Sequence, residues 1–118
     1  MDQIISEILR PFGALRNYHG FYQLIVAIEI ILKNPSRLTY ITSVYMDVAE
    51  QCHCNACTVE RNLRTLIHCM WKRNQIYMKE LAGSSLSKAP TVSQFLDIIT
   101  LYIQKKDPDH IYEVQKEY

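Results

Sequence analysis

The residues best suited to chemistry lie in a basic segment between positions 57 and 74. The segment carries four basic residues against the single acid Glu60, although the whole chain has a formal net charge of only +1. Positive charge gathered on one segment is typical of a surface that meets a phosphate backbone. Four basic side chains can equally form an ordinary solvated face. The four are Arg61, Arg64, Lys72 and Arg73.

Residues 56–73 form two faces when they are placed on a helix of about 3.6 residues per turn. The apolar face consists of Val59, Leu63, Leu66, Ile67 and Met70, with Trp71 at its edge. The opposite face carries Arg61, Arg64, Thr65, His68 and Lys72, with Cys57 and Thr58 at its leading end. This arrangement lets the helix dock on a core while its polar side chains project outward, as they also do on the surface helix of any bundle.

A helix with this outward face suits the major groove of duplex DNA, which admits one α-helix. Arginine can pair bidentately with guanine, and glutamate can accept a hydrogen bond from cytosine. We therefore predict that helix 56–73 reads the major groove. The candidate DNA-contacting residues are Cys57, Thr58, Glu60, Arg61, Arg64, Thr65, His68, Lys72 and Arg73.

The segment before the basic helix supports this hypothesis. A helix predicted at about Leu38–Cys52 carries the small residue Ala49 near its end, where two steeply crossing helices must approach closely. The turn His53-Cys54-Asn55 follows. His53 stands where many such turns have glycine, and histidine tolerates left-handed geometry better than most residues. We predict a helix-turn-helix over about residues 38–74.

Three cysteines crowd into this turn, and a fourth follows at position 69. The pattern Cys52-His53-Cys54-x-x-Cys57 has the spacing of half a zinc knuckle. A second Cys-x-x-Cys pair is missing, and Cys52 falls at an apolar position where free cysteine acts as a small hydrophobe. We expect no metal and no cofactor. A redox role for Cys57, whose thiolate a helix N-terminus would favour, is the other alternative.

The remaining polar residues show no catalytic arrangement. The acidic residues are scattered, and no glycine-rich phosphate loop occurs. The serines at 84, 85 and 87 lie in a loop segment without a paired base. We expect that the protein is not an enzyme.

The composition, together with the positions of the helix-breaking residues, indicates one all-α domain over residues 1–106, followed by a polar tail at 107–118. The chain has 118 residues, 48% of them hydrophobic, enough for one core. Beyond the first amphipathic segment around Ile4–Leu9, we predict helices at about Phe21–Lys33 and Thr91–Lys105, a short helical turn at Ile76–Leu81 and a loop at Gly83–Pro90.

The longest apolar run, Leu24–Leu32, contains Glu29 and is too short to span a bilayer. The start, Met1-Asp2-Gln3, lacks a signal peptide, so we expect a cytoplasmic protein.

The basic segment and several other residues resemble a known protein family, and the resemblance extends from about Ile4 to Tyr102. It is similar to the C-terminal effector domain of the master response regulator of sporulation initiation in endospore-forming bacteria. The strongest block is Val59-Glu60-Arg61-Asn62-Leu63-Arg64, continuing through Ile67 to Trp71-Lys72-Arg73. The other matching residues are Gly13, Gly20 with Phe21-Tyr22-Gln23-Leu24, Asp47-Val48-Ala49, and Pro90-Thr91 with Phe95.

The resemblance implies a compact six-helix domain that binds double-stranded DNA through the second helix of its helix-turn-helix. It implies that Glu60 and Arg61 face base edges and that Arg64 is a further basic contact. Thr58 departs from the pattern, because the family has a DNA-contacting arginine there. The sequence opens directly at the effector domain, so we expect a stand-alone relative or an excised piece, and activation by phosphorylation is not implied.

Two functions follow from these observations. The first is a sequence-specific transcription regulator that binds duplex DNA, with self-association on DNA as a further option. The alternative is a helical protein-protein interaction module that kept the fold and lost DNA reading. Thr58 and the low net charge favour the alternative, whereas the basic helix and the Glu60-Arg61-x-x-Arg64 block favour the regulator.

Overall fold

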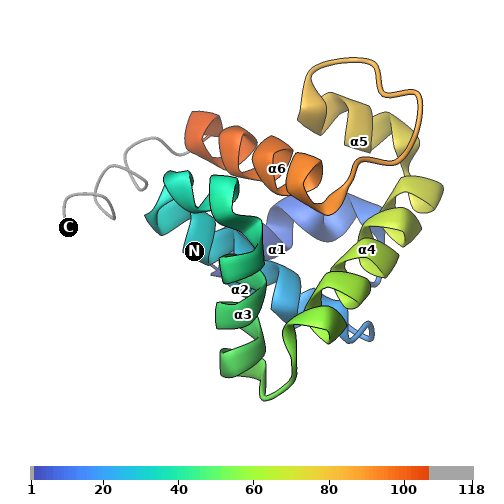
Figure 1. Cartoon of the computed structure of the whole chain (residues 1–118). Coiled ribbons are helices and arrows are strands. Elements are labelled where there is room, and N and C mark those ends of the chain that lie inside the picture. The colour runs from blue at the N-terminus through green and yellow to red at the C-terminus, as the bar shows by residue number, and fades with distance from the viewer. Residues whose placement is uncertain (1, 107–118) are drawn as a thin grey trace.

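The most apolar segment of the chain forms its central helix. The computed structural model describes residues 2–106 (Figure 1), and within it α2 (Gly20–Lys33) buries ten of its 14 residues. This helix packs against α1 (Asp2–Leu9), α3 (Ile41–Cys52), α4 (Ala56–Arg73) and α6 (Val92–Lys106). A helix that is apolar nearly all round must be covered on most sides, and α2 is.

The described residues contain six α-helices and no strand, which confirms the predicted all-α, six-helix class. Besides the five helices named above, α5 (Gln75–Ala82) connects α4 to the loop before α6. Two short 3-10 helices, η1 (Arg10–Phe12) and η2 (Pro35–Tyr40), follow α1 and α2. The radius of gyration is 13.5 Å, as expected for a compact domain of this size. The predicted tail, 107–118, lies outside the described residues.

The helix predicted to start at Leu38 starts later. Residues Pro35–Tyr40 form the tighter η2, and the regular α3 begins only at Ile41. Pro35 sets the first turn, and an ion pair between Arg37 and Asp47, 2.7 Å, ties η2 to α3. The β-branched and aromatic residues at 39–45 therefore cross a change of helix type, which the helical periodicity alone did not reveal.

The segment after α4 was also predicted too short. Asn74 ends α4 and at once caps α5, because its side chain accepts a hydrogen bond from the Tyr77 backbone N–H at 3.1 Å. α5 is consequently a full helix of eight residues rather than one turn at 76–81. Gly83, at φ +68°, ends α5 in left-handed geometry.

The last helix begins one residue after the predicted position, behind a reciprocal cap. The Thr91 hydroxyl accepts from the Gln94 N–H at 3.1 Å, and the Gln94 side chain accepts from the Thr91 N–H at 2.9 Å. This Thr-x-x-Gln box satisfies two backbone donors at the start of α6. The buried side of α6 then covers α2 and α5.

Candidate nucleic-acid interface

The turn between α3 and α4 has the geometry that the sequence predicted. Ala49 is buried near the end of α3. His53 follows in left-handed conformation, at φ 58° and ψ 45°, and the Cys54 N–H bonds to the Ala49 carbonyl at 3.0 Å. Asn55 then caps α4, since its side chain accepts from the Thr58 N–H at 2.9 Å. The two helices pack directly against each other and form the helix-turn-helix.

The predicted apolar face of α4 is its buried face. The buried residues of α4 are Val59, Leu63, Leu66, Ile67 and Met70. Trp71, predicted at the edge of that face, is half-buried. Burial of this stripe against α2 and α3 fixes the rotation of the helix about its axis, so the direction of the opposite face is also fixed.

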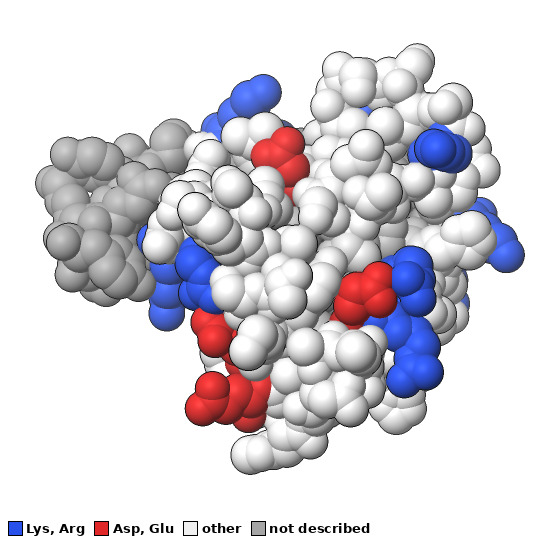
Figure 2. Space-filling model, in the orientation of Figure 1, with Lys and Arg blue, Asp and Glu red and all other residues white. Residues whose placement is uncertain are grey.

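The opposite face of α4 is exposed along its length. Arg61, Thr65, His68 and Lys72 are exposed, and so is Cys57 at the first turn, while Thr58 is half-buried. Within residues 2–106, Arg61 and Lys72 form no hydrogen bond or ion pair that would hold their charges inside the protein. Figure 2 shows blue atoms gathered over the region that α4 occupies in Figure 1, next to a red patch.

Arg64 is not a free cation. Its guanidinium Nη1 donates to the Glu60 carboxylate at 2.7 Å, one helical turn earlier. Both side chains keep solvent exposure, 64% for Arg64 and 36% for Glu60, so the pair can rearrange at low cost. Tyr45 of α3 lies close to it: burial first, and the Glu60 carboxylate second, raise the pKa of the Tyr45 hydroxyl.

Arg73 binds another part of the same chain. Its Nη1 lies 3.4 Å from the Phe12 carbonyl and 3.3 Å from the Ala14 carbonyl, and its Nη2 donates to the Tyr18 hydroxyl at 3.2 Å. The guanidinium also lies over the Tyr18 ring, 5.5 Å from its centre. Of the candidate contact residues, Arg73 is therefore the one whose polar head is held by a loop on the N-terminal side of α2.

Cys69 completes this contact from the previous turn of α4. Its thiol donates to the Tyr18 hydroxyl at 3.2 Å. The hydrogen bond with Cys69 is the main cause that raises the pKa of Tyr18, against the opposing charge of Arg73. The C-terminal end of α4 is thereby attached to residues 12–18 of the same chain.

Two residues that the sequence offered only as part of the family resemblance, Gln23 and Gly20, also position α4. Gln23 is buried in α2; its amide nitrogen donates to the Cys54 sulfur at 3.7 Å, and its amide oxygen accepts from Asn62 at 3.2 Å. It thus links the turn to α4. A glutamine in a largely apolar helix was the signal available in the sequence.

Gly20 allows α2 and α4 to come this close. A Cβ at Gly20 would lie 2.8 Å from the Asn62 carbonyl oxygen, far inside van der Waals contact. The glycine is thus required by space, since a backbone atom of a packed helix cannot move aside as a flexible side chain can.

The cysteines are free thiols and do not converge on a metal site in the part of the chain that the structure describes. Cys52 and Cys54 pack partly against the core, whereas Cys57 is exposed. Burial is the main cause that raises the pKa of the Cys52 thiol, which makes it a poorer metal ligand and nucleophile.

Among residues 2–106, the longest apolar helices fall short of what a membrane crossing requires.

Comparison with known proteins agrees with the resemblance seen in the sequence. The model of the family described as sporulation initiation factor Spo0A, C terminal, matches residues 5–103. A search of curated proteins found no match. The family match runs from α1 to α6 and includes the entire helix-turn-helix. The chain therefore belongs to the family of the C-terminal domain of the sporulation initiation factor Spo0A, a family of DNA-binding regulatory domains rather than enzymes.

Proposed function

We propose that the protein is a sequence-specific transcription regulator that reads the major groove of duplex DNA with α4. The observation that carries this proposal is Arg61, an exposed arginine in the second turn of α4 with no ionic partner among the described residues. In helix-turn-helix docking the N-terminal part of the recognition helix enters the groove. Arg61 then meets base edges, where arginine prefers guanine.

The other exposed residues of α4 take roles that follow from their position along the helix. Cys57, Thr58 and Glu60 share its first two turns with Arg61 and lie nearest the bases. Arg64 and Thr65 come one turn later, and His68 and Lys72 face the sugar-phosphate backbone as the helix rises out of the groove. We assign Arg73 to the positioning of the helix rather than to DNA, because its guanidinium is held by the 12–18 segment.

This assignment predicts a modest electrostatic component of binding. Of the four basic residues on α4, one is held by the loop and one is paired with Glu60. We expect that roughly two to four phosphates are neutralised, so that log K falls with log salt at a slope of about −2 to −4. Discrimination between duplexes then depends on Arg61 and its neighbours more than on charge.

The experiment that tests the proposal is selection of duplexes from a random pool, followed by fluorescence anisotropy at several salt concentrations. The selected duplex should bind at least tenfold more tightly than a shuffled duplex of equal composition, at every salt concentration. Equal affinity for both duplexes would contradict sequence-specific reading. Sedimentation of the complex then gives the number of copies per site, and more than one copy supports self-association on DNA.

The second candidate is a helical protein-protein interaction module. The Glu60–Arg64 ion pair supports it, since it removes one free cation from the outward face, and so does Thr58 at a position where an arginine would touch DNA. Absence of duplex binding at low salt would favour this candidate.

The regulator proposal also places the protein in the cytoplasm, where its DNA partner would lie.

A further inference from the structure

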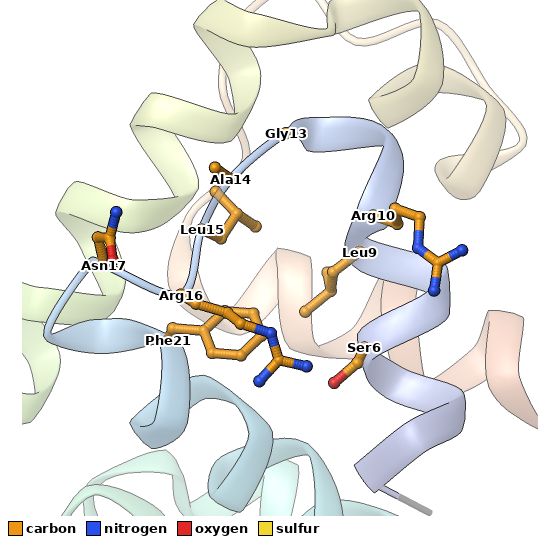
Figure 3. A pocket seen from close by; sticks show the side chains of 9 residues that line it. All are labelled: Ser6, Leu9, Arg10, Gly13, Ala14, Leu15, Arg16, Asn17 and Phe21. Atoms are coloured by element: carbon orange, nitrogen blue, oxygen red, sulfur yellow. The ribbon is translucent and has the colours of Figure 1, made fainter.

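A cavity lies on the other side of the 12–18 segment from α4. It has a volume of about 240 Å³, is open to solvent on one side, and is lined by residues of α1, η1, the loop after η1 and the first turn of α2. Figure 3 shows that the side chains of Leu9, Leu15 and Phe21 line its inner part. None of its lining residues belongs to α4, so the cavity is separate from the proposed DNA-contacting face.

The rim of the cavity is polar and basic. Arg10 comes from η1 and Arg16 from the loop, and Ser6 of α1 lies between them in Figure 3, where the Arg10 side chain points outward from the rim. Both arginines are exposed, and neither forms a hydrogen bond or an ion pair with a carboxylate among the described side chains of residues 3–106. Glu7 borders the outer side of the same two arginines without pairing with them.

The Arg16 guanidinium is nevertheless held in place. It lies over the Phe21 ring at 5.5 Å from the ring centre. A guanidinium over an aromatic face is attracted to the ring and still has N–H donors for a carboxylate or phosphate. The contact with Phe21 therefore places a donor group at the mouth of an apolar space.

The walls of the cavity are fixed by backbone hydrogen bonds. The Gly13 N–H bonds to the Arg10 carbonyl at 2.9 Å, and the Tyr18 N–H to the Leu15 carbonyl at 3.0 Å. From the other side, Arg73 holds the Ala14 carbonyl at 3.3 Å. Gly13 itself has φ +98°, a conformation that favours glycine. A loop fixed at three points forms the cavity without a ligand.

We propose that this cavity binds a small organic anion, with its carboxylate or phosphate between Arg10 and Arg16 and a short apolar group against Leu9, Leu15 and Phe21. The two guanidinium groups and the Ser6 hydroxyl supply donors for an oxyanion. The volume limits the ligand to about the size of one ring, since pockets for drug-sized ligands measure roughly 300–1,000 Å³. The site and its ligand class lie beyond the proposed DNA-binding function.

The test is titration of the isotopically labelled protein with phenyl phosphate, followed by amide chemical shifts. We expect saturable shifts confined to residues 6–21, with a Kd on the order of 1 mM for so small a ligand. Benzoate, titrated in parallel, shows whether the site prefers carboxylate or phosphate, and binding of either one supports the proposal. Benzyl alcohol and inorganic phosphate, which each lack one half of the ligand, should bind at least tenfold more weakly.

Variants separate a built site from general attraction between opposite charges. The double variant R10Q/R16Q should weaken phenyl phosphate binding at least tenfold, while the matched variant R61Q/K72Q on α4 should leave it unchanged. All four side chains are exposed, so the fold should persist, and circular dichroism verifies this. Shifts that are not saturable, equal binding of inorganic phosphate, or loss only in R61Q/K72Q would overturn the proposal. Weakened duplex binding by R10Q/R16Q, without any phenyl phosphate binding, would assign the two arginines to DNA instead.

Discussion

The Arg73 guanidinium lies 5.5 Å from the centre of the Tyr18 ring and donates a hydrogen bond to the Tyr18 hydroxyl at 3.2 Å. This contact joins the last turn of α4 to a loop 55 residues earlier in the chain. The neighbouring Lys72 is exposed and makes no such contact within residues 2–106. Two adjacent basic residues thus have different surroundings, and they should behave differently when they are replaced.

Arg73→Ala should lower the free energy of unfolding by about 1–2 kcal/mol, because it removes a cation–π contact and charged hydrogen bonds to the loop. Lys72→Ala should change stability by less than about 0.5 kcal/mol, yet weaken binding to all duplexes alike. Urea denaturation and anisotropy measure the two effects. If Arg73→Ala left stability unchanged and weakened duplex binding as Lys72→Ala does, Arg73 would be a DNA contact after all.

Arg61→Ala should cost roughly 1–3 kcal/mol in binding to the selected duplex and relax the preference at one base pair. The physical reason is the loss of a bidentate pairing with a base edge. Anisotropy with duplexes that differ at single positions locates that base pair, and Lys72→Ala is the control, because it should weaken all of these duplexes equally. Equal losses on selected and random duplex in Arg61→Ala would mean that Arg61 touches only phosphate.

Glu60→Gln should increase affinity for random duplex and reduce discrimination. The variant removes a negative charge from the face that we propose meets DNA and breaks the 2.7 Å ion pair, which would free Arg64 for a phosphate. The steeper salt dependence that follows, by up to about one phosphate, is measurable in the same titrations. Its effect on stability should stay within about 0.5 kcal/mol, because exposed pairs one turn apart contribute little. An unchanged salt slope would show that Arg64 stays away from DNA.

Gly20→Ala should lower the free energy of unfolding by about 1–3 kcal/mol, the usual range for overpacking. The new methyl would lie 2.8 Å from the Asn62 carbonyl oxygen, so α2 and α4 would have to separate. Gly83→Asn is the control: a Cβ at Gly83 would meet no atom within 4 Å, and asparagine tolerates its left-handed conformation. Urea denaturation measures the free energy of unfolding of both variants. An equal decrease in the two would argue against the close contact of α2 and α4 as the cause.

Tyr77 should make stability depend on alkaline pH. Burial raises the pKa of its hydroxyl to about 12, from the usual 10.0 of tyrosine, and the hydroxyl donates to the Ile8 carbonyl. Since the pKa is higher in the folded state, the stabilisation is complete below pH 10 and is lost as the pH rises from 10 to 12. Tyr77→Phe should show a smaller decrease over this range in urea denaturation. Tyr22→Phe, at an exposed tyrosine, should keep the decrease of the original protein.

The sequence by itself determined the helix-turn-helix and the two faces of its second helix. The apolar stripe of α4 had to be buried, because leaving five large side chains in water would cost more than any local alternative offers. Once the stripe is buried, the helical period fixes where Arg61 and Lys72 point. The left-handed His53 was also predictable, since the short turn requires that conformation and few residues adopt it. Even the Glu60–Arg64 ion pair could have been predicted from the sequence, because it joins residues one helical turn apart.

Only the tertiary structure decided which polar groups of α4 are held by other parts of the chain and which are free. Arg73 had the same sequence signature as Lys72, but its partners Phe12, Ala14 and Tyr18 come from a loop about 60 residues away in the chain. Gln23 likewise reaches Cys54 and Asn62 across 31 and 39 residues. Periodicity describes the direction of a side chain relative to its own helix. The partner it meets depends on how α2 and α4 pack, and that packing decided the outcome.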